Sequence, residues 1–113
     1  MKLADICRKL DLKTLTPDLP LDREINKGYA GDLLSDVMAN ADPGSIWVTM
    51  QIHLNIVAVA LIKEIACIAI SSGRAPEDKV LKKAIKEGIP IFSSDLQSFE
   101  LIGRLHALGI SGE

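Results

Sequence analysis

Aromatic residues are scarce in this sequence, and neither sign of charge is in excess. Aromatic side chains make up 4% of the 113 residues, so a surface on which nucleic-acid bases stack is not expected. Thirteen basic residues stand against fifteen acidic ones, which leaves a formal net charge of −2. Proteins that bind nucleic acid through its phosphates normally carry a basic excess. Both shortages therefore argue against a nucleic-acid partner.

Cysteine occurs only twice, as Cys7 and Cys67. Two thiols are too few for a disulfide framework or for a zinc site of four thiolates. Each lies in an apolar stretch, so we expect two free, buried thiols in a reducing cytosol. The two histidines, His53 and His106, do not complete a metal-ligand spacing with them. No metal site and no cofactor is therefore expected.

No apolar run is long enough to cross a membrane. Residues 45–62 carry no formal charge, but polar side chains interrupt the run and a Lys-Glu pair closes it. Because a spanning helix needs about 20 predominantly apolar residues, we expect a buried strand followed by a buried helix here. The N-terminus has no apolar signal core before Asp5. We expect a soluble, cytoplasmic protein without a membrane partner.

Length and composition indicate one globular domain over residues 1–113. Hydrophobic residues make up 48% and charged residues 25%, which is ordinary for a folded domain of this size. Apolar residues at helical spacing predict an N-terminal helix over residues 1–10. A short strand at 12–16 and a weak strand at 21–29 follow, and then a helix at 33–39 that Asp32 caps.

Residues 46–108 alternate three times between an apolar strand and a helix. The strands are expected at 46–50, 67–70 and 89–92. The helices are expected at 56–65, from Pro76 to a stop at Gly88, and at 96–108 after a cap at Asp95. Continuous apolar strands joined by helices are typical of a parallel sheet covered on both faces. The sequence therefore predicts an α/β fold with a predominantly parallel sheet and helices on both faces.

Polar residues follow each of these three strands, where ligands collect in open α/β sheets. The run Ser71-Ser72-Gly73-Arg74 resembles a small phosphate or carboxylate cradle. Its glycine permits close approach, its hydroxyls donate hydrogen bonds, and its guanidinium pairs with the anion. Turns and helix caps need the same residue types, so a purely structural role stays open. The candidate ligand-binding residues are Gln51, His53, Asn55, Ser71, Ser72, Gly73, Arg74, Ser93, Ser94 and Asp95.

Recognisable catalytic motifs are missing. The sequence contains no G-x-x-x-x-G-K-S/T phosphate loop, no G-x-S-x-G elbow and no glycine fingerprint for a dinucleotide. We assign no catalytic residue and expect a protein that is not an enzyme.

The helix at 56–65 is apolar almost all round, and such a helix must be buried on every side. A domain of this length has few layers with which to do so. We therefore expect a homodimer whose seam includes this helix or the final one, where Gly103 permits close contact.

Five segments together resemble a stand-alone DRTGG domain, over roughly residues 12–108. The family is named for an Asp-Arg pair and a Thr-Gly-Gly turn. Here Ser71-Ser72-Gly73 stands at the turn, and Gln51 to Asn55 replaces the Asp-Arg region. The segments are GDLLSDVMANA (31–41), WVTMQIHLNIVAVA (47–60), ISSGRAP (70–76), EGIPIFSSD (87–95) and FEL (99–101).

The resemblance implies a regulatory role. DRTGG domains are similar to the N-terminal, non-catalytic domain of HPr kinase/phosphorylase, and they accompany CBS domains in some pyrophosphatases. It implies a non-catalytic module that senses a small anionic ligand, phosphate-containing or a nucleotide, or that docks a partner protein. Two alternatives stay open: a small phosphotransfer or hydrolytic enzyme that uses His53 or Asp95, and a purely structural dimerisation module.

Overall fold

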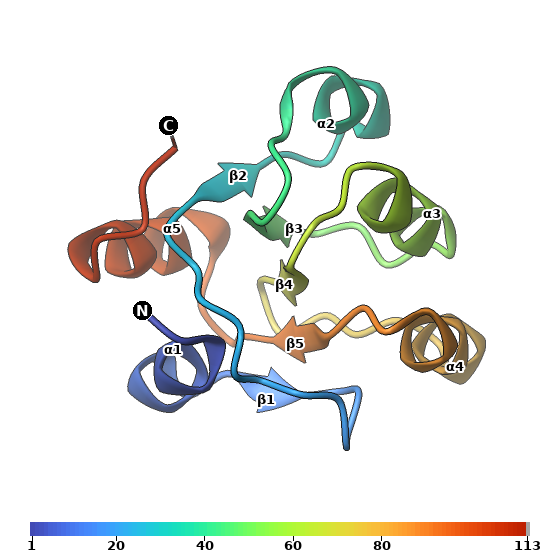
Figure 1. The fold of residues 1–113 in the computed structure, drawn as a ribbon, viewed down its shortest axis with the longest axis horizontal. Helices are drawn as coiled ribbons and strands as arrows, with labels where there is room; N and C mark the ends of the chain where they lie inside the picture. The colour runs from blue at the N-terminus through green and yellow to red at the C-terminus, as the bar shows by residue number, and fades with distance from the viewer. Residues whose placement is uncertain (113) are drawn as a thin grey trace.

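A five-stranded sheet runs through the middle of the molecule, between two layers of helices (Figure 1). The computed structural model describes residues 1–112. Four strands are parallel, and β1 joins the edge of β5 in the antiparallel sense. The order across the sheet is β1-β5-β4-β3-β2. The strands are β1 (Lys13–Thr14), β2 (Gly28–Ala30), β3 (Ile46–Thr49), β4 (Cys67–Ile70) and β5 (Ile91–Ser93).

The two central strands, β3 and β4, are apolar throughout because both faces of the sheet are covered. Every residue in them is buried, as the continuous apolar runs predict. Successive side chains of a strand point to opposite faces. Trp47 and Ile68 therefore enter one core cluster, and Val48 and Ala69 enter the other.

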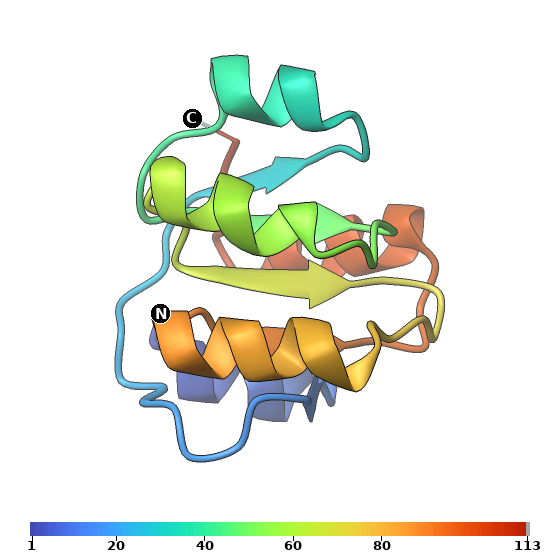
Figure 2. The ribbon, with the colours of Figure 1, turned by 90° about the vertical axis from the view of Figure 1, so that its right-hand side faces the viewer.

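Three helices cover one face of the sheet and two cover the other, which confirms the expected α/β fold with helices on both faces. The helices α2, α3 and α4 link successive parallel strands and lie side by side, with α3 in the middle (Figures 1 and 2). Helices α1 and α5 share the opposite face. The bounds are α1 (Leu3–Leu10), α2 (Leu34–Asn40), α3 (Asn55–Ile62), α4 (Asp78–Glu87) and α5 (Ser98–Ala107).

No helix within residues 1–112 combines the length and the apolar character that a bilayer-spanning segment needs.

Three expected helix starts are wrong. Asp32 and Asp95 cap no helix, because α2 follows Leu33 and α5 follows Gln97. The Asp32 carboxylate instead accepts hydrogen bonds from residues at the end of β3. Leu96 is held in the loop before α5 by a hydrogen bond at its N–H and another at its carbonyl. Pro76 precedes the first residue of α4, Asp78, by two positions.

Helix α3 is not buried on every side, so that expectation is also wrong. Ile56 and Ala60 point into the core and are buried. Leu61 and Ile62 are 39% and 66% exposed. The sheet lies beneath α3 and two helices flank it, so its fourth side faces outward.

Both thiols are free, as expected, although only Cys67 is fully buried and Cys7 is half-buried. Desolvation raises the pKa of Cys7 to about 11 and raises the pKa of Cys67 further. Because the thiolate is the nucleophile, a raised pKa makes a thiol slow to react.

We therefore predict that a disulfide reagent such as DTNB reacts slowly with the folded protein at pH 8. Cys7 should react before Cys67, and both should react at once in guanidinium chloride, where burial is lost. Absorbance of the released thiolate measures the rates. The Cys7→Ser variant is the control and should retain only the slower phase. Rapid release of two equivalents from the folded protein would contradict the prediction.

Candidate functional site

The carboxyl ends of β2, β3 and β4 lie at the same edge of the sheet, and a polar cleft opens there. Its volume is about 350 Å³, and its lining residues are Asp32, Met50, Gln51 and Arg74. Asp32 follows β2, Met50 and Gln51 follow β3, and Arg74 follows β4. Parallel pairing places these three loops beside one another, because each parallel strand ends at the same edge. We call this the polar cleft.

Hydrogen bonds join the loops after β2 and β3 into one wall of the polar cleft. The Asp32 Oδ1 atom accepts from the Thr49 hydroxyl at 2.9 Å and from the Met50 N–H at 2.7 Å. The Gln51 side-chain amide donates to the Asp32 carbonyl at 2.9 Å, and the Gln51 N–H donates to Thr49 Oγ1 at 3.1 Å. Thr49 is buried. The carboxylate and the main-chain carbonyl of Asp32 therefore both hold this wall together.

A second set of hydrogen bonds fixes the residues on either side of Asp32. The indole N–H of Trp47, which is fully buried, donates to the Gly31 carbonyl at 2.9 Å. The Tyr29 hydroxyl donates to Asp36 Oδ2 at 2.6 Å, and Asn40 donates to the other carboxylate oxygen. The hydrogen bond to Asp36 raises the pKa of Tyr29, so the hydroxyl stays protonated. The chain between β2 and α2 is thus fixed by side chains from three elements.

The opposite wall is the turn after β4. Ser72 and Gly73 have φ angles of 63° and 67°, in the left-handed region that glycine adopts at little cost. Their N–H groups donate to the carbonyls of Leu96 and Ser94, each at 2.7 Å. An anion at this turn would thus have to be held by side chains rather than by these two N–H groups.

Arg74 is the cation of the polar cleft. Its guanidinium forms no hydrogen bond or ion pair with any residue between 1 and 112. A guanidinium carries five donors and no acceptor. Arg74 therefore brings an unpaired positive charge to a cleft that Asp32 also lines.

The other candidate residues of the β4 and β5 loops mostly hold those loops together. Ser71 is buried, and its hydroxyl lies 2.6 Å from that of Ser98. Ser94 is buried too, and its hydroxyl accepts from the Leu96 N–H. Ser93 is half-buried in β5. Asp95 is exposed, and its Oδ1 lies 3.5 Å from the point where a Cβ on Gly73 would stand.

His53 and Asn55 lie apart from the polar cleft. A second cleft of about 300 Å³ opens between the starts of α3 and α4, and Gln51 lines both clefts. The Nδ1 atom of His53 accepts from the Asn55 N–H at 3.1 Å, so this imidazole closes the first turn of α3. Asn55 is exposed and lines neither cleft. The other residues of the second cleft are Ile52, His53, Leu54, Glu77, Lys79 and Val80.

The structure thus brings Gln51 and Arg74 together and adds two residues that the sequence did not suggest, Asp32 and Met50. The sequence signal for Asp32 was its place just after a strand. The sequence pattern places that weak strand outside the three strand–helix units, and the rule on strand ends predicts a site only after strands that are expected to be parallel. Within the described part of the chain, residues 1–112, no three His, Cys, Asp or Glu side chains are grouped to hold a metal.

No protein-family model and no curated protein matches this sequence. A solved structure does match. It is described as the CBS and DRTGG domains of the regulatory region of a Clostridium perfringens pyrophosphatase, complexed with the activator diadenosine tetraphosphate. The TM-score is 0.66 at 16% sequence identity, over 97% of this chain and 47% of that one. The chain therefore spans about half the length of that structure, and the two share a fold.

The hydrogen bonds of Thr49 yield a prediction about the polar cleft. Thr49→Val keeps the shape of the side chain but removes the hydroxyl that joins Asp32 to Gln51. Because two part-buried hydrogen bonds are lost, the free energy of unfolding should fall by about 1 kcal/mol. Urea denaturation followed by the fluorescence of Trp47 measures the change. Thr14→Val, at an exposed position of β1, is the control and should change stability by less than about 0.5 kcal/mol. Equal effects of the two substitutions would contradict the described role.

Proposed function

We propose that this chain is a non-catalytic, ligand-sensing module that binds a small phosphate-containing ligand, a nucleotide, in the polar cleft. The observation that carries the proposal is the unpaired guanidinium of Arg74 at the carboxyl edge of the parallel strands. Arginine matches the geometry of a phosphate with two parallel hydrogen bonds. The exposed hydroxyl of Ser72, two residues away, is a further donor on the same turn.

The carboxylate of Asp32 favours a nucleotide over a bare phosphate. A negative charge on the wall facing Arg74 repels an anion that fills the whole cleft, but it accepts hydrogen bonds from hydroxyl or amino groups. A nucleotide carries its anionic group at one end and such donors at the other. The match to a structure complexed with a dinucleoside polyphosphate is consistent with this ligand class.

The second cleft supplies an apolar surface next to the polar one. Ile52, Leu54 and Val80 line it, and Gln51 stands between the two clefts. A base or another flat apolar group could rest there while the phosphate pairs with Arg74, since ligand sites combine apolar walls with a few placed polar groups.

The sensing role is inferred from the loops that a bound ligand would connect. The polar cleft is built from the loops after β2, β3 and β4, of which only the first two are joined by the hydrogen bonds of Asp32. A ligand held by both Arg74 and Asp32 would tie the third loop to the other two. Binding to the folded state alone also raises its stability. Such a change in loop order is what a partner protein or a neighbouring domain could read.

The test is a titration with AMP, ADP, ATP, diadenosine tetraphosphate and inorganic phosphate, by calorimetry and by thermal shift. We expect at least one nucleotide to bind, and Arg74→Ala to weaken it by about 10-fold or more, as expected for loss of a charge-assisted hydrogen bond. Arg74 is exposed, so folding should be unaffected. Arg8→Ala, an exposed arginine of α1 that pairs with Asp5, is the matched control and should leave affinity unchanged.

Asp32→Asn distinguishes the contribution of the phosphate end of the ligand to affinity from that of its other end. The amide oxygen can still accept from Thr49 and Met50, while the negative charge is lost. We expect nucleotide affinity to change while affinity for inorganic phosphate is unchanged or rises. No binding by any of these compounds, or equal affinity of the wild type and Arg74→Ala, would refute the proposed function.

A further inference from the structure

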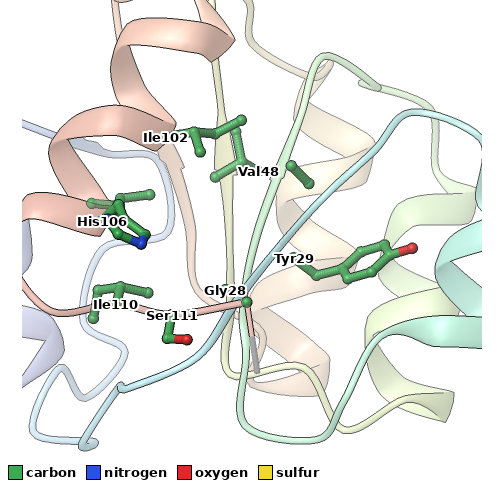
Figure 3. Close-up of a pocket in the computed structure, with 10 residues that line it drawn as sticks. Gly28, Tyr29, Val48, Ile102, His106, Ile110 and Ser111 are labelled. Carbon is green, nitrogen blue, oxygen red and sulfur yellow. The ribbon is translucent and has the colours of Figure 1, made fainter.

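An apolar groove lies on the other face of the sheet, away from the polar cleft. Its volume is about 300 Å³, and it runs between β2, α5 and the last described residues (Figure 3). Ile102, His106 and Ile110 form one side of it, opposite Gly28 and Val48 of the sheet (Figure 3). The Tyr29 ring points away from the groove, toward Asp36 of α2.

The groove exists because this face of the sheet has two helices for five strands. Helix α1 lies near β1, and α5 packs over β3. The edge strand β2 is left without a helix on this side. Only the C-terminal residues reach it, where the Gly28 N–H donates to the Ser111 carbonyl at 2.8 Å.

Next to the groove, α5 carries an apolar stripe that nothing covers. Phe99, Ile102, Gly103 and His106 recur at i, i+3, i+4 and i+7 and therefore share one side of the helix. Phe99 is 89% exposed and Ile102 is 38% exposed. No atom lies within 4 Å of the point where a Cβ on Gly103 would stand. Ile102 and His106 belong both to the stripe and to the groove, so the two form one continuous apolar surface.

We propose that this surface pairs two copies of the chain through antiparallel α5 helices, with each Phe99 seated in the groove of its partner. The inference is independent of the proposed function, because it uses a different face of the sheet. A two-fold interface requires a patch that is complementary to itself. This surface has both halves of such a match, a projecting aromatic ring and an apolar hollow.

The residue spacing along α5 places the Phe99 ring of one copy opposite the groove of the other. When the two-fold axis passes between Ile102 and Gly103, Phe99 of one copy lies opposite His106 of the other, at the groove. Ile102 then lies over the partner's Gly103, where there is room for it. The missing side chain lets the two helices approach closely.

Charges beside the stripe select this arrangement. Glu100 and Arg104 are exposed and lie on the side of the stripe away from Ile102, with 3.4 Å between their charged groups. In the antiparallel pair, Glu100 of each copy comes beside Arg104 of the other, so both contacts are attractive. In a parallel pair, this side of one stripe would face the opposite side of the partner's stripe, so neither contact would form. The surface is therefore complementary in charge to a second, antiparallel copy.

The first experiment measures mass in solution by analytical ultracentrifugation over a range of concentrations. We expect the full chain to be a dimer of about twice 12.2 kDa. Phe99→Glu should raise the dissociation constant about 30-fold or more, as the loss of a central aromatic anchor does. Because Phe99 is exposed, the variant should fold as the wild type does. Ile62→Glu is the matched control, since Ile62 is a large apolar residue of α3 that is 66% exposed, and should leave the dimer intact.

Three further variants keep the test independent of folding. Gly103→Leu places a side chain where the single copy has room for it, so it should raise the thermal midpoint of the isolated copy while weakening the dimer. Glu100→Arg should weaken the dimer, and Glu100→Arg with Arg104→Glu should restore it. A monomeric wild type at 100 micromolar, or a dimer lost with Ile62→Glu but kept with Phe99→Glu, would overturn the inference. Nucleotide titration of the Phe99→Glu protein reports separately on the polar cleft, whose binding should be unchanged.

Discussion

Strands β2 to β5 follow one another across the sheet in chain order, and each is parallel to the next. Crossovers between parallel strands are right-handed because strands twist to the right. A sheet that always advances in the same direction must therefore place all of its linking helices on one face. This constraint puts α2, α3 and α4 together and leaves the other face to the two remaining helices. The polar cleft and the apolar groove both follow from it.

The polar cleft follows because every parallel strand ends at the same edge, and the loops after β2, β3 and β4 meet there. Hydrogen bonds then fix the positions of these loops relative to one another. Asp32 joins the first two loops through its carboxylate and its carbonyl, while the turn after β4 is joined to the loop after β5 by main-chain hydrogen bonds. Arg74 comes from the turn after β4 and lines the cleft, with its charge unpaired by any residue from 1 to 112. The apolar groove follows from the same constraint, because α1 and α5 are too few to reach the β2 edge.

Some of this could be predicted from the sequence, and the reasons for success and failure differ by element. β4 was predicted at its observed bounds because a strand buried on both faces must be apolar at every position. The strand expected at 21–29 contains only the start of β2 (Gly28–Ala30), since its position depends on pairing with β3 rather than on local pattern. The caps expected at Asp32 and Asp95 are local signals, and distant partners overrode them. The rule on strand ends predicts Gln51 and Arg74 at the edge of the sheet where the polar cleft opens, whereas the local pattern at Asp32 indicates a helix cap.

The turn at Ser72 and Gly73 has a further consequence for how this fold could diversify. Its main-chain donors are committed to the carbonyls of Leu96 and Ser94, so neither of these N–H groups is left to bind a ligand. A ligand in the polar cleft would then have to be held by side chains, and the side chain of Arg74 is not among those that hold the loops together. Substitution of Arg74 would therefore change the charge of the cleft and leave the hydrogen bonds of the loops in place, whereas substitution of Gln51 would remove the hydrogen bond that its side chain donates to the Asp32 carbonyl.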